Sequence, residues 1–248
     1  MNTTMDEPAT QKILVVRRHS LVTRLTHWIN LLAMSILLMS GLQILNAHPA
    51  LYWGEAGFSR AQAWFQITTH GAATAFPGWI TLPSYRDLAT GRRWHLFFAW
   101  LLFVNGLLYF GAGLLTRHFW RDLIPRRAEL SPRHLGSEIW HHLKLQFPTG
   151  EAARHYNSLQ KIAYSIVVFM IAPIAVLTGL TMSPGIDAAA PFLLDLFGGR
   201  QSARSLHFIA ANLLVVFVAA HVGALLAVGV WNELRSMITG KYAIKVDG

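Results

Sequence analysis

The sequence predicts an all-α integral membrane protein in which four transmembrane helices form one bundle. Three observations lead to this fold class. Of the 248 residues, 53% are hydrophobic and only 13% are charged, whereas a soluble protein carries about 25% charged residues. The apolar runs have the length that a helix needs to cross a bilayer and are too long for β-barrel strands. The basic residues are concentrated between these runs, a pattern that is typical of membrane topology and argues against nucleic-acid binding.

Four apolar segments define the predicted membrane domain, which we treat as a single domain over residues 1–248. The chain begins with a polar, basic stretch. No clear cleavage site follows the first apolar segment, so we expect this segment to be retained and not removed as a signal peptide. Pro173 in the third segment predicts a kink, which a helix bundle tolerates. The predicted spans cover about 27–45, 94–115, 159–182 and 205–231.

Two long connections separate the spans. The connection 46–93 is rich in Pro, Gly and aromatic residues, which favours a folded surface segment with a short helix; a fifth or re-entrant membrane segment is the alternative. The connection 116–158 is hydrophilic. With four spans both termini share one side, and that side holds 15 Lys and Arg residues against 6 on the other. The positive-inside rule therefore places the termini and 116–158 in the cytoplasm, and 46–93 in the periplasm.

The residue types that are missing narrow the chemistry. The chain has no cysteine, which excludes thiolate metal sites, iron–sulfur clusters, disulfides and covalent c-type haem attachment. A haem would therefore be held non-covalently, by His or Met. No Asp or Glu lies within a predicted span, which argues against a proton pump or a cation transporter.

Four of the twelve histidines lie in the predicted spans: His27, His95, His207 and His221. His207 and His221 are 14 residues apart on one helix, a rise of about 21 Å that leaves both on nearly the same face. The topology places His27 with His221 at the cytoplasmic level and His95 with His207 at the other level. Two facing imidazoles suit bis-His ligation of a b-type haem, whereas zinc needs four converging ligands. The alternative for each histidine is a hydrogen-bonded core residue.

An arginine stands three residues before three of these histidines: Arg24 before His27, Arg92 before His95, and Arg204 before His207. Residues at this spacing share a helical face, and each arginine is one turn nearer the membrane surface. Each guanidinium is thus a candidate for binding a haem propionate through charge-assisted hydrogen bonds. The alternative is that these arginines mark the interface and extend towards water.

Other small and polar residues in the spans have weaker meaning. Five glycines near the histidines fit either porphyrin clearance or ordinary close packing of membrane helices: Gly41, Gly106, Gly111, Gly113 and Gly223. We expect Gln43 and Asn105 to form hydrogen bonds between helices. The adjacent His141 and His142 do not share a helical face and are expected to be solvated.

The motifs around the histidines resemble the four-helix, di-haem cytochrome b family. This family includes bacterial b561 cytochromes and the membrane subunits of nickel–iron hydrogenases, formate dehydrogenase and thiosulfate reductase. The resemblance covers all four spans and rests on Arg-Leu-Thr-His27-Trp, Arg-Arg-Trp-His95, the His207–His221 spacing and Tyr156-Asn-Ser-Leu-Gln-Lys161. It implies two haem b groups, ligated by His27 with His221 and by His95 with His207. It also implies electron transfer between a quinone and a partner on the far side of the membrane.

The segment 46–93 resembles the branch of the family that works with periplasmic molybdopterin oxidoreductases. We therefore expect an electron-transfer subunit in the bacterial inner membrane, with no catalytic residue of its own, and interpret 46–93 as a docking surface; a lid over the outer haem is the alternative. A rival function is a stand-alone superoxide:quinone oxidoreductase. Its basic rim would attract the anion and would consist of Arg60, Arg86, Arg92, Arg93 and Arg204.

Overall fold

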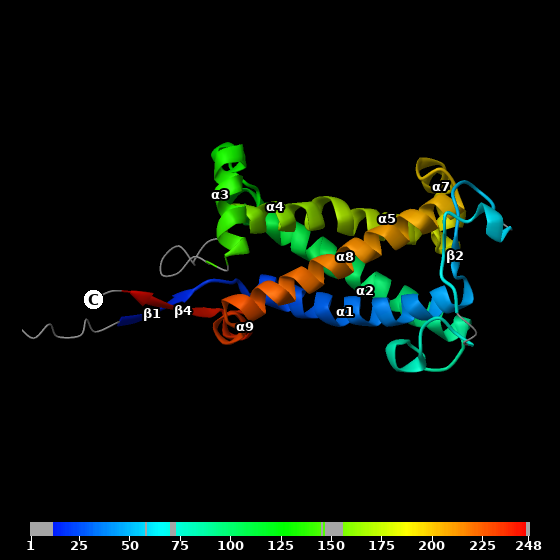
Figure 1. Ribbon diagram of the computed structural model, residues 1–248, viewed down its shortest axis with the longest axis horizontal. Helices are drawn as coiled ribbons and strands as arrows, with labels where there is room; N and C mark the ends of the chain where they lie inside the picture. The colour runs from blue at the N-terminus through cyan, green and yellow to red at the C-terminus, as the bar shows by residue number, and fades with distance from the viewer. Residues whose placement is uncertain (1–11, 58, 70–72, 145, 147–155, 247–248) are drawn as a thin grey trace, which may run out of the picture. The chain divides into compact units, whose positions relative to one another are not determined.

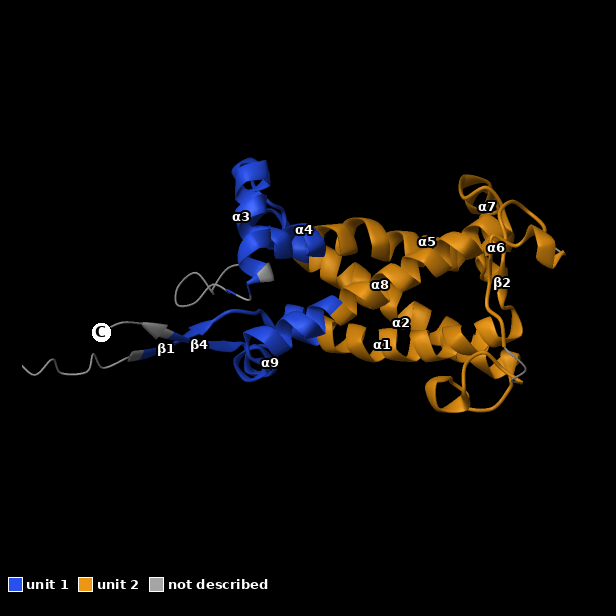
Figure 2. Ribbon diagram, viewed as in Figure 1, with its two compact units in different colours: residues 1–25, 113–164, 220–248 blue, residues 26–112, 165–219 orange. Residues whose placement is uncertain are grey.

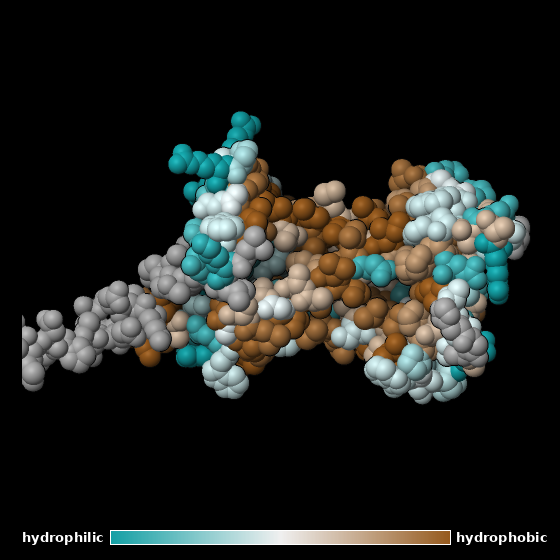
Figure 3. All heavy atoms as spheres, viewed as in Figure 1, coloured by the Kyte–Doolittle hydropathy of each residue, from teal (hydrophilic) through white to brown (hydrophobic). Residues whose placement is uncertain are grey.

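The structure is a computed structural model and describes residues 12–57, 59–69, 73–144, 146 and 156–246. Within these residues four helices are long and apolar enough to cross a membrane (Figure 1): α1 (Leu21–Ala47), α2 (Leu88–Leu115), α4 with α5 (Ser158–Thr181) and α8 (Arg200–Val228). Hydrophobic side chains cover these helices on the face seen in Figure 3. The predicted fold class, a mostly helical membrane protein with four spans, is confirmed.

The third span is irregular around Pro173. It consists of α4 (Ser158–Ile166), a π-helical turn (Val167–Ile171) and α5 (Ala172–Thr181). Proline has no N–H to donate to the preceding turn and its ring crowds that turn, and a single wide π turn is one way in which a helix accommodates such a break. The irregularity therefore lies where the sequence predicted a kink.

The fourth membrane-length helix begins before the predicted start at Ser205 and ends before Trp231, the predicted end. Helix α8 ends at Val228, and Gly229 has φ 113°, a backbone conformation that favours glycine. Helix α9 (Val230–Thr239) follows and ends at Gly240, which has φ 80° and a left-handed cap conformation. Gly229 thus separates the membrane helix α8 from the short helix α9, and Gly240 separates α9 from the strand that follows.

The two ends of the described chain form a β-ribbon that the sequence did not predict. Strand β1 (Lys12–Arg17) pairs antiparallel with β4 (Lys241–Val246). Next to the ribbon, Nη1 of Arg18 donates to both carboxylate oxygens of Glu233 in α9 at 2.9 Å, and its guanidinium lies 4.5 Å from the centre of the Tyr242 ring. The fold class remains helical, with this ribbon as an addition.

The chain divides into two compact units, shown in Figure 2. Unit 1 comprises residues 1–25, 113–164 and 220–248, and unit 2 comprises residues 26–112 and 165–219. Helices α1, α2 and α8 contribute residues to both units. We describe each unit by itself.

Unit 2 contains the long connection after the first span. Its described residues form the two-residue strands β2 (Ala50–Leu51) and β3 (Phe65–Gln66), which pair with each other, and the 3₁₀ turns η1 (Arg60–Gln62) and η2 (Gly78–Ile80). No membrane-length helix occurs in the described part of this connection. The predicted short helix is thus replaced by 3₁₀ turns. Unit 2 also includes the short helices α6 (Pro184–Ala189) and α7 (Phe192–Leu196).

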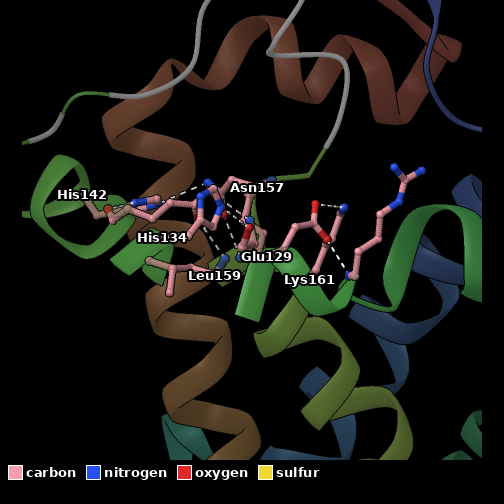
Figure 4. A network of polar contacts seen from close by, with 10 residues as sticks. Glu129, His134, His142, Asn157, Leu159 and Lys161 are labelled. Carbon is pink, nitrogen blue, oxygen red and sulfur yellow. Dashed lines mark hydrogen bonds and ion pairs between the residues drawn. The ribbon is translucent and has the colours of Figure 1, made fainter. Parts of the chain in front are cut away.

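In unit 1, helix α3 (Pro132–Leu143) is bound to the start of α4 by a polar network (Figure 4). The carboxylate of Glu138 accepts hydrogen bonds from the backbone N–H groups of Ser158 and Leu159, at 3.3 and 3.1 Å, and thereby satisfies two donors at the helix start. His142 contacts the carbonyl oxygen of Glu138 at 2.9 Å and the side-chain nitrogen of Asn157 at 3.3 Å. The expectation that His142 is solvated is therefore wrong, whereas His141 is exposed.

A second part of this network is a partly buried ion pair between Lys161 and Glu129. Nζ of Lys161 lies 2.6 Å from Oε1 of Glu129, and the backbone N–H of Arg126 donates to Oε2 at 2.7 Å. Burial acts to raise the pKa of Glu129, but the hydrogen bonds from Lys161 and Arg126 outweigh it and hold the pKa below its ordinary value. Glu129 therefore stabilises the fold above its ordinary pKa, and this contribution is lost as the pH falls through its lower folded pKa.

We expect Glu129→Gln to lower the free energy of unfolding by about 2 kcal/mol near pH 7, because the partly buried ammonium of Lys161 loses its carboxylate. The difference from the parent should disappear below the folded pKa of Glu129, since protonation removes the same charge. Thermal unfolding in detergent across this pH range measures both effects. Lys241→Met removes an exposed charge and is the control. A deficit that is the same at every pH contradicts the assignment.

Candidate functional site

Unit 2 brings two of the predicted histidines together. His95 lies on α2 and His207 on α8, and their ring centroids are 6.1 Å apart with an angle of 71° between the ring planes. These residues are 112 positions apart in the sequence. The pairing that the topology predicted at this level is therefore present in the structure.

The Nδ1 atom of His95 is bound to α1. It lies 3.1 Å from Oγ of Ser40. Because Oγ of Ser40 donates its own proton to the carbonyl of Ile36 at 2.7 Å, it has a lone pair left to accept from Nδ1. This assigns the Nδ1–H tautomer to His95 and leaves Nε2 as the basic nitrogen.

His207 is bound to α5 in the same manner. Its Nδ1 lies 2.8 Å from the carbonyl oxygen of Ala175 and 3.2 Å from Oγ1 of Thr178. A carbonyl oxygen can only accept, so Nδ1 carries the proton and Nε2 has a free lone pair. A histidine that ligates a metal usually donates its other ring N–H to such a partner. The sequence did not predict a role for Ser40 or Thr178, because its only signal there is a hydroxyl residue next to a glycine in a span.

The other predicted pair, His27 and His221, joins residues of different units. In unit 2 the His27 ring contacts Trp28 edge to face, with centroids 5.7 Å apart. In unit 1 the His221 ring contacts Tyr164, with centroids 6.3 Å apart. The ligation of a haem by His27 and His221 stays a prediction.

The three predicted arginines have different surroundings. In unit 2, Arg204 donates from Nη2 to the carbonyl oxygen of His48, and Arg92 is exposed. In unit 1, Arg24 donates from Nη2 to the carbonyl oxygen of Ile238, and its buried Nε has no acceptor in the described part of the chain. Each guanidinium has N–H donors beyond these contacts. Propionate binding by these residues stays a prediction.

Two of these arginines act on His48, which directly follows α1. Burial lowers the pKa of His48, and the positive charges of Arg204 and Arg92 lower it further. This residue is therefore neutral at pH 7. At this position of unit 2, positive charge therefore comes from Arg92 and Arg204 and not from His48.

The connection after the first span packs on α8 close to His207. Oγ of Ser202 accepts from the backbone N–H of Gly54 at 2.8 Å, and the carbonyl of Gly54 accepts from the N–H groups of Gln201 and Ser202. Nε1 of Trp64 donates to Oγ of Ser205 at 2.8 Å. The first N–H groups of a helix have no acceptor within the helix. At the start of α8, the carbonyl of Gly54 in the connection is the acceptor.

The same connection has a second attachment, to the end of α1. Nε2 of Gln43 donates to the carbonyl of Tyr85 at 2.6 Å, and the amide of Asn46 makes two hydrogen bonds to the backbone of Phe76. The expectation of a bond between helices is therefore wrong for Gln43. It is correct for Asn105, whose Nδ2 donates to the carbonyl of Thr26 in α1 at 2.8 Å.

Comparison with known protein families matches residues 18–240 to prokaryotic cytochrome b561. The chain belongs to the prokaryotic cytochrome b561 family. A relative from Azospira oryzae (strain ATCC BAA-33 / DSM 13638 / PS) is 33% identical over 219 residues, which are 88% of this chain and 93% of the relative. That relative is provisionally named protein-methionine-sulfoxide reductase subunit YedZ1.

Haem b is the cofactor of this cytochrome family, and the His95–His207 pair fits it. A metal–imidazole bond is about 2 Å long and the nitrogen lies about 1 Å from the ring centre, so two rings on opposite sides of one iron have centroids about 6 Å apart. The observed separation is 6.1 Å. A Cβ on Gly179 would lie 3.2 Å from Cε1 of His207, closer than ordinary contact, so glycine leaves room for the ring at this position.

We expect Trp64→Phe to loosen the connection of this cytochrome from α8, because the variant lacks the N–H that donates to Ser205. Loss of one hydrogen bond of about 1 kcal/mol should raise the population of the open segment about fivefold. The rate of tryptic cleavage after the exposed Arg60 measures this population. Trp79→Phe is the control, since Trp79 is 81% exposed. Equal cleavage rates in the two variants would exclude Trp64 as an anchor.

Proposed function

We propose that this cytochrome b561 is the di-haem subunit of a membrane oxidoreductase and passes electrons from quinol to a partner reductase. The observation that carries the proposal is the His95–His207 pair, with its 6.1 Å separation and with both Nδ1 atoms bound to neighbouring helices. Haem supplies the one-electron chemistry, and the chain supplies ligation, orientation and burial.

A second haem, held by His27 and His221, extends the path across the membrane. The 14-residue spacing of His207 and His221 on α8 supports this assignment, because it separates the two levels by about 21 Å on one helical face. Like the His95–His207 pair, the His27–His221 pair offers two imidazoles as ligands. Electrons would move between the two levels within this chain.

The orientation follows from the distribution of charge. Both termini and the connection 116–158 would face the cytoplasm of a bacterial inner membrane, since that side holds 15 of the Lys and Arg residues. The segment 46–93 would face the periplasm, next to the His95–His207 pair. A quinone would exchange electrons at one level and the partner protein at the other.

The name of the Azospira relative supports a class of partner. If this chain serves the same kind of enzyme, its partner reduces methionine sulfoxide in proteins, and the family resemblance favours a molybdopterin enzyme. Reduction of one sulfoxide to a thioether consumes two electrons and two protons and releases water. Oxidation of one quinol to quinone supplies both electrons and releases two protons. The balance therefore requires electron flow from the quinone pool to the partner.

We expect two haem b groups per polypeptide in the purified chain. Each of four substitutions should lose the haem at its own level: His95→Ala and His207→Ala at one level, His27→Ala and His221→Ala at the other. Pyridine haemochrome assays against protein concentration, combined with redox titration, measure the content and identify which component is lost. His141→Ala is the control, because His141 is exposed. A parent without haem would exclude the proposed function.

The partner is tested by purification of the full chain from native membranes in mild detergent. We expect a molybdenum-containing protein to co-purify and the complex to reduce a methionine-sulfoxide peptide with quinol as the donor. If the chain is instead a stand-alone superoxide:quinone oxidoreductase, we expect no such partner. Superoxide should then reduce the haem of the isolated chain at a diffusion-limited rate. Molybdenum content and the two rates distinguish these functions.

A further inference from the structure

The two imidazoles of the His95–His207 pair have equivalent surroundings on two different helices. On α5, the ring of His207 contacts the carbonyl of Ala175 and the hydroxyl of Thr178. On α1, the ring of His95 contacts the hydroxyl of Ser40. In both cases the hydroxyl oxygen also lies 3.2 Å from the carbonyl oxygen three residues earlier in its own helix, that of Leu37 or Ala175.

The local sequences are equivalent as well. Residues 39–42 read Met-Ser-Gly-Leu and residues 177–180 read Leu-Thr-Gly-Leu. Each hydroxyl donates to the carbonyl four residues earlier in its own helix: Ser40 to Ile36 at 2.7 Å, and Thr178 to Ile174 at 2.6 Å. With its proton used in this way, each oxygen can only accept from the imidazole N–H.

The chain order repeats in the same way. The α1 motif is followed by a connection and then by Arg92 and His95 on α2, and the α5 motif is followed by a connection and then by Arg204 and His207 on α8. Each half therefore consists of a Ser/Thr-Gly helix and a helix with Arg-x-x-His. The connections differ in length and composition, which hides the repeat in the sequence.

We propose that the His95–His207 site is built from two equivalent half-sites, in which the hydroxyls of Ser40 and Thr178 are positioning residues that set the rotation of the two imidazole planes. The proposal rests on the proposed function in one respect, namely that both histidines ligate one haem. An imidazole N–H that donates to an acceptor on a neighbouring helix has one preferred rotation about its bond to Cβ. Two such constraints on separate helices define the 71° angle between the rings.

The glycines of the two half-sites are equivalent in place but differ in clearance. A Cβ on Gly41 would lie 3.5 Å from Cε1 of His95, an ordinary van der Waals distance. A Cβ on Gly179 would lie 3.2 Å from Cε1 of His207 and 3.4 Å from its Nδ1, which forces the ring to shift by a few tenths of an ångström. Gly179→Ala should therefore disturb the haem site, and Gly41→Ala should leave it unchanged.

The test uses the full chain loaded with haem and electron paramagnetic resonance of its ferric form. Nearly perpendicular imidazole planes give a strongly anisotropic low-spin signal, and rotation of one ring shifts its largest g value. We expect Ser40→Ala and Thr178→Val to shift this g value and to raise the midpoint potential of one haem only. A ring N–H with fewer acceptors makes a weaker donor to iron, which favours the ferrous state.

Matched variants separate positioning from general stability. Ser35→Ala removes a hydroxyl that bonds the carbonyl of Leu31 on the exposed face of α1, and Thr181→Val removes a buried hydroxyl of α5 that bonds the carbonyl of Thr178 and, among the described residues, no imidazole. Both should keep the parent signal. Ser40→Thr and Thr178→Ser exchange the two hydroxyl residues between half-sites and should restore it.

The outcomes are distinguishable. Parent spectra in Ser40→Ala and Thr178→Val overturn the positioning role, while the proposed function stands. Equal shifts or equal haem loss in the variants and in their matched controls also overturn it, because the effect is then one of general stability. A parent chain that holds no haem at this level overturns the proposed function instead.

Discussion

The structure of unit 2 depends on the hydrogen bond from each imidazole Nδ1–H to an acceptor on a neighbouring helix. Inside a bilayer there is no water to replace such a bond, so an imidazole without a partner is costly. The bonds of His95 to α1 and of His207 to α5 meet this requirement. They also tie α2 to α1 and α8 to α5. The same contacts that stabilise the helix pairs therefore leave Nε2 of each ring as its basic nitrogen.

Small polar residues surround these bonds. Ser40, Thr178, Ser205 and Thr181 are fully buried, and each hydroxyl donates to a backbone carbonyl. In a membrane protein such residues allow close approach of helices and leave no unsatisfied donor. Ser205 has a further role, because it accepts from Trp64 and so connects the helix of His207 to the long connection. The helix that carries His207 and the segment 46–93 are thereby joined through one hydroxyl group.

The expectation for the segment 46–93 left a docking surface and a lid as alternatives. The described part has features of both. Its inner side binds α8 through Gly54 and Trp64, as a lid does. Its outer side leaves Trp53 and Trp64 stacked at 5.5 Å with exposures of 50% and 40%. Half-exposed, rigid aromatic side chains are common anchors of protein interfaces, so a lid over the site and a contact surface for a partner are compatible in one segment.

By itself the sequence determined the membrane class, the four spans, the family and the four candidate haem ligands. These follow from local information: the length of apolar runs, the helical spacing of histidines and the motifs around them. The β1–β4 ribbon was missed, because it joins the two ends of the chain and pairing at that distance has no local signal. The role of His142 was missed for the same reason, since its partner Asn157 lies 15 positions further along the chain.

Only the tertiary structure decided which acceptors hold the imidazoles. Ser40 and Thr178 look like ordinary helix-packing residues in the sequence, and they acquire meaning only when α2 and α8 present His95 and His207 to them. A hydrogen bond depends on distance and direction within a few tenths of an ångström, and no periodicity in a single helix specifies that. The sequence thus determined which residues are available to ligate haem, and packing between helices decided how they are oriented.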